Sequence, residues 1–127
     1  MKTNELMLYY SAGACSLASH IALKESGLSF EARPVDLFQG DQRAESFLAL
    51  NPKGRIPLLL TTAGPISESP AILEYVASMA PEARLAPSDP YLAAKMRSFN
   101  CYLCATVHVA HAHGPRGIRW ADSESAL

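Results

Sequence analysis

The sequence predicts an α/β domain built on a mixed four-stranded sheet, followed by an incomplete all-α domain. Over residues 1–81, short apolar runs and helical patterns alternate in the order β-α-β-α-β-β-α. A proline-rich linker at 82–90 then leads into one long helical pattern over 91–113. Because a lone helix with an apolar face needs partners, we expect residues 91–127 to be the first part of a truncated helical domain.

The composition indicates a chain that folds and excludes two classes of partner. Of the 127 residues, 49% are hydrophobic and 18% are charged, which is enough apolar surface for a packed core. The net charge is -1 with both signs interspersed, so neither nucleic acid nor a membrane is expected as a partner. The chain has no apolar run of membrane-spanning length and no secretory signal, which predicts a cytoplasmic protein. In that reducing compartment Cys15, Cys101 and Cys104 should be free thiols.

The first part of the chain has the pattern strand, turn, helix, strand. The apolar run ELMLYY at 5–10 and the breaker cluster SAGA precede a helix predicted over 15–26, which stops at Gly27. The apolar positions that indicate this helix are Leu17, Ile21 and Ala22. A strand over 29–37 follows, and its internal Pro34 removes a hydrogen-bond donor, which places the strand at a sheet edge. The short links predict a right-handed βαβ unit.

The second part of the predicted sheet is antiparallel. A polar loop leads into a short helix over 43–50, and a buried strand is predicted over 56–62. The tripeptide AGP then separates this strand from a very short strand at 66–68. Two apolar runs joined by such a turn predict a hairpin, so the complete sheet combines parallel and antiparallel pairs.

The clearest helix of this domain is predicted over 69–80. Ser69 suits the N-cap and Pro70 suits the first helical position. An apolar stripe at helical spacing consists of Ile72, Leu73, Val76 and Met79.

Three motifs in this order resemble a known family. They are LYYSAGACSLASHIAL at 8–23, NPKGRIPLL at 51–59 and SESPAILEY at 67–75. Together they resemble the N-terminal, thioredoxin-like domain of cytosolic glutathione S-transferases, and the likeness extends over about residues 5–113. The first motif resembles the bacterial beta class, which has a cysteine where other classes place Tyr or Ser. The resemblance implies a homodimeric glutathione transferase that takes glutathione as co-substrate, acts on a small electrophilic or disulfide substrate and needs no metal.

The proline of the second motif lies at the mouth of a strand, where a cis bond would turn the backbone outward. From the residues alone, a trans proline that simply begins a strand is the alternative. The resemblance implies that Pro57 is cis and that the backbone of Ile56 pairs with the cysteinyl residue of glutathione.

The third motif places Glu68 and Ser69 at a helix N-terminus, where unpaired N–H groups favour a carboxylate. The resemblance implies that Glu68 takes the ammonium of the γ-glutamyl end, while the hydroxyl and amide of Ser69 take its carboxylate. An ordinary serine cap beside an exposed glutamate is the alternative.

Cys15 lies at or just before the first turn of its helix, where the dipole and free N–H groups favour a thiolate. Gly13 and the alanines on either side of it would let a ligand approach the backbone closely. A buried structural cysteine is the alternative, and a disulfide is disfavoured by the compartment. The resemblance implies that Cys15 faces the glutathione sulfur, and that Tyr10 is the tyrosine that neighbours the site. A strand-end aromatic in the core is the alternative for Tyr10.

The long helix carries potential metal ligands. Read as a zinc set these would be Cys101, Cys104, His108, His111 and His113. One face of a continuous helix cannot wrap a tetrahedral ion, and a redox CxxC belongs at a helix N-terminus, so neither role is expected. The resemblance implies instead that His108 reaches the catalytic cysteine from this helix, with a packed or solvated histidine as the alternative.

The sequence also departs from the family pattern. Gly40 stands where the beta class has a glutathione-binding lysine, and Val109 and Phe99 replace a lysine and a tryptophan of the long helix. Two other functions stay open, the first because a cysteine at position 15 allows it and the second because of these departures and the truncated helical domain. One is a thiol-disulfide or deglutathionylating activity through a mixed disulfide between Cys15 and glutathione. The other is a non-catalytic binding or scaffold protein of the same fold.

Overall fold

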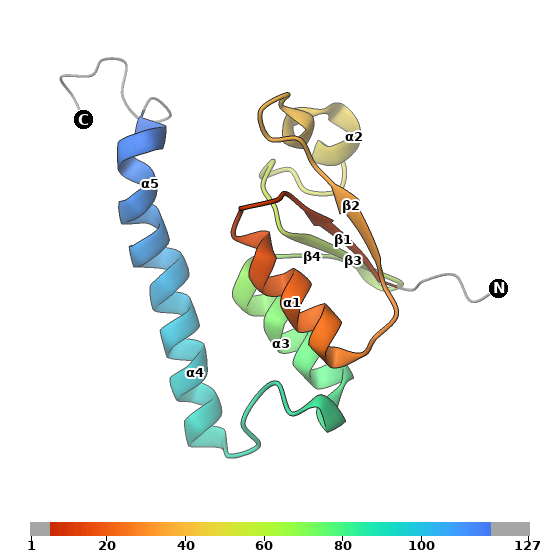
Figure 1. The fold of residues 1–127 in the computed structure, drawn as a ribbon, viewed down its shortest axis with the longest axis vertical. Helices are drawn as coiled ribbons and strands as arrows, with labels where there is room; N and C mark the ends of the chain where they lie inside the picture. The colour runs from red at the N-terminus through yellow and green to blue at the C-terminus, as the bar shows by residue number, and fades with distance from the viewer. Residues whose placement is uncertain (1–5, 118–127) are drawn as a thin grey trace. The chain divides into compact units, whose positions relative to one another are not determined.

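The structure is a computed structural model that describes residues 6–117 of the chain. It consists of two compact units, which divide between Ala86 and Pro87 and are described separately below (Figure 1). Within the described residues, no helix is both long and apolar enough to cross a membrane.

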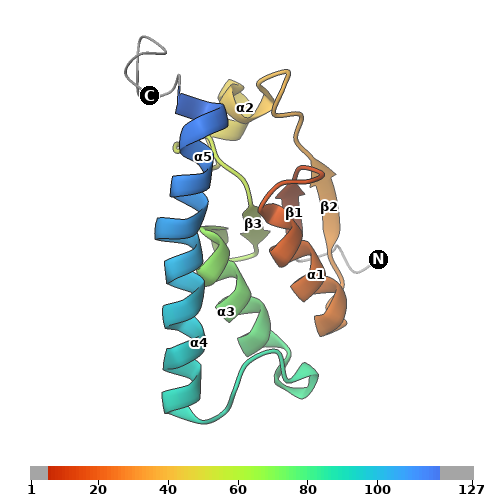
Figure 2. The same cartoon turned by 60° about the vertical axis from the view of Figure 1, so that its left-hand side comes forward.

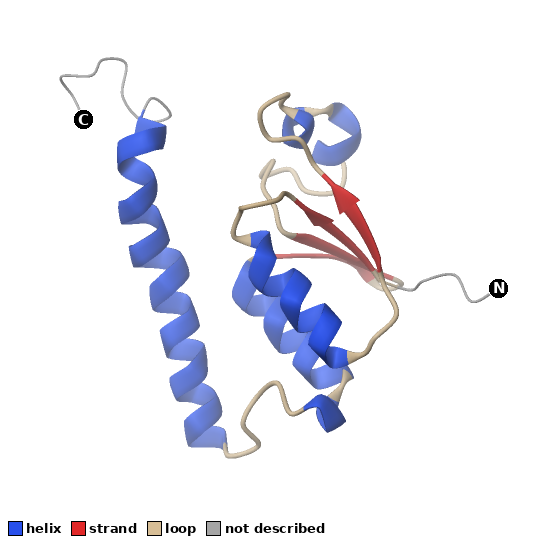
Figure 3. Ribbon diagram, in the orientation of Figure 1, coloured by secondary structure: helices blue, strands red, loops and turns tan. Residues whose placement is uncertain are grey.

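The first unit is built on a four-stranded mixed sheet, as predicted. Its strands, drawn in red in Figure 3, are β1 (Met7–Tyr10), β2 (Glu31–Pro34), β3 (Leu58–Thr61) and β4 (Gly64–Ser67). Their spatial order is β2-β1-β3-β4. β1 pairs parallel with β2 and antiparallel with β3, while β3 and β4 form the antiparallel hairpin. The strand that contains Pro34 lies at an edge, where the missing N–H donor removes no ladder bond.

Helices cover both faces of this sheet. The α1 helix (Ser16–Ser26) and the α3 helix (Ser69–Met79) lie side by side in both views (Figures 1 and 2). They enclose the larger core cluster, whose buried members are Leu6, Leu8, Leu23, Leu59, Ile72 and Val76. Alternate strand residues point to the opposite face, where Leu58 packs with Val35 and with Phe47 of the short α2 helix (Glu45–Leu48). The predicted thioredoxin-like fold is therefore confirmed.

The α1 helix is confirmed, but its buried face differs from its apolar pattern. Leu17 and Ile21 are 57% and 52% exposed. The buried residues are instead Ser16, Ser19, Leu23 and Ser26. Small hydroxyl side chains allow the α1 backbone to lie close to its neighbours, and Ser26 satisfies its buried hydroxyl by donating to the carbonyl of Leu23 at 2.7 Å.

The second unit contains one continuous helical path with an irregular centre. It comprises α4 (Pro90–Tyr102), a π-helical turn (Leu103–Val107) and α5 (His108–Arg116). Asp89 caps the beginning, because its Oδ1 accepts from the N–H of Leu92 at 2.8 Å.

Two details of this helix were not predicted. The π-helical turn interrupts a segment that we expected to be regular, and the helix runs through Gly114 and Pro115, where we expected a turn. A proline in the last helical turn removes only one backbone bond, so the helix can include it before ending. Trp120 and the further helix that we expected to begin at Asp122 or Ser123 lie outside the described residues.

Candidate functional site

Strand direction brings the predicted site residues of the first unit to one edge of the sheet. The register pairs Tyr9 with Leu58 and Leu58 with Ser67, so the ends of β1 and β4 lie beside the beginning of β3. Figure 2 shows the opposed directions of β1 and β3. The loop with Cys15 follows β1, the Ile56–Pro57 bond precedes β3, and Glu68 follows β4. The fold therefore places three separate sequence motifs at a common edge.

Cys15 is an exposed free thiol at the N-cap position of α1. Its Sγ donates to the carbonyl oxygen of Ile56 at 3.6 Å. The preceding turn is closed by Ser16, whose Oγ accepts from the N–H of Ser11 at 3.1 Å and donates to its carbonyl at 3.2 Å. Gly13 has φ +71° and open space beside it, which leaves this turn accessible. A buried structural cysteine is thus excluded.

Pro57 is cis, and the trans alternative is wrong. The proline is buried, while Ile56 is half-buried and packs against the smaller core cluster. The Ile56 carbonyl is directed toward Cys15, as the hydrogen bond from Sγ shows.

Asn51 is a buried residue that holds the loop before β3, and the sequence analysis did not single it out. It is 3% exposed, and its amide donates to the carbonyl of Arg55 at 2.7 Å. Its Oδ1 accepts from the backbone N–H of Lys53 at 3.3 Å. The loop also needs Gly54, with φ +60°, because an added Cβ would lie 3.1 Å from the carbonyl oxygen of Gln42. Only the turn-forming character of Asn-Pro signalled this loop in the sequence.

Replacing Asn51 by alanine is expected to lower the free energy of unfolding by about 1 to 3 kcal/mol, because it removes two partly buried hydrogen bonds that hold the loop. Urea denaturation followed by circular dichroism measures the change. The variant Asn51→Asp keeps the acceptor for Lys53 but places a carboxylate oxygen against the carbonyl of Arg55, so it should also be destabilised. An Asp variant as stable as the unsubstituted protein would show that the bond to Arg55 contributes nothing.

The beginning of α3 differs by one residue from the prediction. Glu68, not Ser69, occupies the cap position, and it makes no side-chain cap bond. Its backbone has φ +77° and ψ 123°, a region that costs a non-glycine residue about 1 to 3 kcal/mol. The N–H groups of Ser69 and Ala71 belong to the first helical turn and have no partner within the helix, so they can serve an anion.

Lys53 contacts this helix start and was also missed by the sequence analysis. Its Nζ forms an ion pair with Oε1 of Glu68 at 2.5 Å and donates to Oγ of Ser67 at 2.8 Å. The lysine and glutamate are 15 positions apart and belong to different elements, so the periodicity of the sequence could not predict this contact.

Tyr10 lies at the margin of the larger core cluster. Its ring packs edge-on against His20 with 4.9 Å between centroids, and His20 packs in the same way against Phe30 at 5.7 Å. These contacts give Tyr10 a packing role, as expected of an aromatic residue at a strand end in the core.

Gly40 occupies the position of the lysine that the family pattern would place after β2. Its φ is +82°, a left-handed conformation that lysine adopts only with strain. The local backbone therefore favours the glycine found here.

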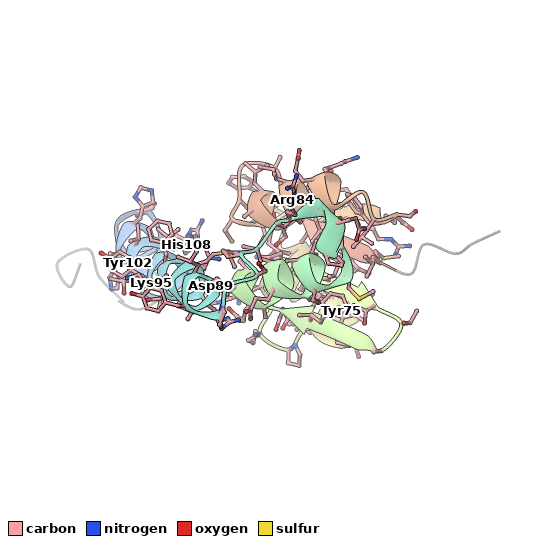
Figure 4. All side chains as sticks on the ribbon, turned by 90° about the horizontal axis from the view of Figure 1, so that it is seen from below. Tyr75, Arg84, Asp89, Lys95, Tyr102 and His108 are labelled. Atoms are coloured by element: carbon pink, nitrogen blue, oxygen red, sulfur yellow. The ribbon has the colours of Figure 1, made fainter. Side chains whose placement is uncertain are left out.

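His108 is exposed and begins α5 in the second unit, whereas Cys15 belongs to the first. Figure 4 labels its side chain on the helix. Cys101, Cys104 and His111 are exposed on the same helical path. Among the residues that the structure describes, no three His, Cys, Asp or Glu side chains are grouped so that they could hold a metal ion.

Comparisons with known proteins agree with these features. Residues 5–78 match the family model for the glutathione S-transferase N-terminal domain. Glutathione S-transferase GstA of Escherichia coli O157:H7 is 38% identical over 106 residues, which cover 81% of this chain and 53% of that protein. A maleylacetoacetate isomerase of Pseudomonas aeruginosa is 36% identical over 110 residues, covering 84% and 51% of the two chains.

A solved structure gives the same result. The crystal structure of a glutathione transferase homologue from Sulfitobacter, with bound glutathione, is 44% identical and has a TM-score of 0.91. The match covers 97% of this chain and 60% of the other. The present chain therefore spans about half the length of the curated relatives that it matches.

Proposed function

The chain belongs to the glutathione S-transferase family, and from this premise we propose that it binds glutathione at the described sheet edge and transfers the glutathione thiol. The observation that carries the proposal is the exposed Cys15 thiol, 3.6 Å from the carbonyl oxygen of Ile56. In an enzyme of this type the co-substrate sulfur would lie beside Cys15. A small electrophilic substrate would react with the glutathione sulfur at this position.

The cysteinyl and γ-glutamyl parts of glutathione have proposed partners at this edge. The backbone of Ile56, fixed by the cis bond to Pro57, would pair with the cysteinyl residue. The carboxylate of Glu68 would accept from the γ-glutamyl ammonium. The hydroxyl and N–H of Ser69 would hold the neighbouring carboxylate at the helix start. Tyr10 would border the site from the end of β1.

The proposed chemistry depends on orientation and on the state of one sulfur atom. A thiolate is the reactive form of glutathione, and the Cys15 thiol could donate a hydrogen bond to it. When the protein holds this thiolate beside a bound electrophile, the reaction becomes effectively unimolecular, which lowers the entropic part of its barrier. We propose His108 as a second catalytic group contributed by the helical unit, and a homodimer as the assembly.

A second candidate function is thiol-disulfide exchange, which the exposure of Cys15 favours. The Cys15 thiolate would attack the glutathione sulfur of a mixed disulfide, form a Cys15–glutathione disulfide and release the substrate thiolate. Free glutathione thiolate would then attack the glutathione sulfur of that disulfide. The products would be glutathione disulfide and the regenerated Cys15 thiolate.

Calorimetric titration with glutathione tests the proposal. Binding at millimolar or lower concentration is expected, and Glu68→Gln should weaken it about tenfold, because a charge-assisted bond to the ammonium becomes a neutral one. Glu25→Gln is the matched control, since Glu25 is exposed on α1 and should leave affinity unchanged. A chain that does not bind at millimolar glutathione would support the scaffold function instead. Binding that Glu68→Gln leaves unchanged would contradict the assigned orientation.

A further inference from the structure

The carboxylate proposed to take the ligand ammonium is already engaged by a lysine. Oε1 of Glu68 accepts from Nζ of Lys53, and Nζ also donates to Oγ of Ser67 at 2.8 Å. The side chains of Lys53 and Glu68 are 48% and 64% exposed. This pair therefore lies where an approaching ligand can reach it.

The backbone holds both partners of this pair in place. The buried amide of Asn51 ties together the loop from Lys53 to Arg55. Glu68 is set by its positive φ and by the N–H of Ile72, which donates to its carbonyl at 3.1 Å. Because β3 and β4 pair antiparallel, the loop before one strand and the residue after the other are neighbours. The fold therefore sets the backbone positions of both residues of the ion pair.

This inference rests on the proposed glutathione site. We propose that Lys53 sets the selectivity of that site for the α-ammonium group of its ligand. The ammonium of Lys53 and that of the ligand are cations that compete for one carboxylate, so Lys53 weakens binding of the ammonium form. A ligand that lacks the ammonium but keeps the adjacent carboxylate benefits from Lys53, because the lysine screens the charge of Glu68. Removing the lysine should therefore shift the two affinities in opposite directions.

The test compares glutathione with glutaryl-cysteinyl-glycine, which lacks only the α-ammonium group. Calorimetry of Lys53→Met should show glutathione binding about two- to fivefold tighter and the analogue binding weaker by a similar factor, the size expected of an exposed ion pair. Both shifts should decrease with added salt. Lys53→Arg keeps the charge and should resemble the unsubstituted protein.

Lys24→Met is the control for loss of one positive charge away from the site. Lys24 lies in the last turn of α1, where its Nζ is 5.3 Å from the ring centroid of Phe30. This control variant should leave both affinities unchanged. If Lys53→Met alters neither affinity, or shifts both in the same direction, the role of Lys53 is overturned while the glutathione site stands. An unsubstituted chain that binds neither ligand at millimolar concentration would overturn the proposed function and this inference together.

Discussion

Replacing Cys15 by serine is expected to reduce disulfide exchange by at least about a hundredfold, because a serine hydroxyl forms no mixed disulfide and is a far weaker nucleophile. Conjugation of glutathione to an electrophile should stay within about tenfold of the unsubstituted rate, since the hydroxyl can still donate to a thiolate. Two assays on one preparation measure the split: reduction of a glutathione mixed disulfide, and conjugation to an aromatic halide.

Two further variants make this prediction decisive. Cys15→Ala removes the donor as well, so conjugation should fall about ten- to a hundredfold below that of the serine variant, the size expected of a bond to a charged group. Cys101→Ser is the matched control, because Cys101 is also an exposed free cysteine but lies in the helical unit. It should change neither activity. Unchanged rates in both assays for both Cys15 variants would remove this residue from the mechanism.

The order of elements could be predicted from the sequence because each boundary has a local cause. Gly27 ends α1 in the left-handed conformation, and the N–H of this glycine donates to the carbonyl of Lys24 at 3.3 Å. Two apolar runs pair as the predicted hairpin of β3 and β4, but the turn lies at residues 62 and 63, because Gly64 and Pro65 of the predicted AGP turn already belong to β4. Once the strand directions are known, the common edge of Cys15, Ile56 and Glu68 follows from the topology.

The features that escaped prediction depend on contacts between distant residues or on unusual packing. Lys53 and Glu68 meet only because β3 and β4 form a hairpin, and nothing in the sequence around either residue indicates this ion pair. The buried serines of α1 carry no hydrophobic signal, since burial there depends on close approach rather than on apolar area. The cap position of α3 fell on Glu68, whose positive φ no sequence propensity indicates.

Replacing Leu59 by alanine is expected to lower the free energy of unfolding by about 2 to 5 kcal/mol, from lost transfer energy and the cavity left behind. Leu59 is fully buried on β3, opposite Leu8 on one side and Ile66 on the other. It also belongs to the core cluster that α1 and α3 enclose. Because whole domains are stable by only about 5 to 15 kcal/mol, this is a large fraction of the total. Urea denaturation should show a lower midpoint at an unchanged slope.

Leu17→Ala provides the matched control, since it removes the same atoms from a residue that is 57% exposed on α1. Partial exposure means that the leucine has less apolar surface to lose from the interior, so the cost should stay below about 1 kcal/mol. The comparison shows whether the cost of removing a leucine follows its observed burial or its place in the apolar sequence pattern of α1. If Leu17→Ala destabilised the protein as much as Leu59→Ala, the outer face of α1 would have to be covered in the folded protein. If neither substitution had an effect, the cluster around Leu59 could not be the core that stabilises the sheet.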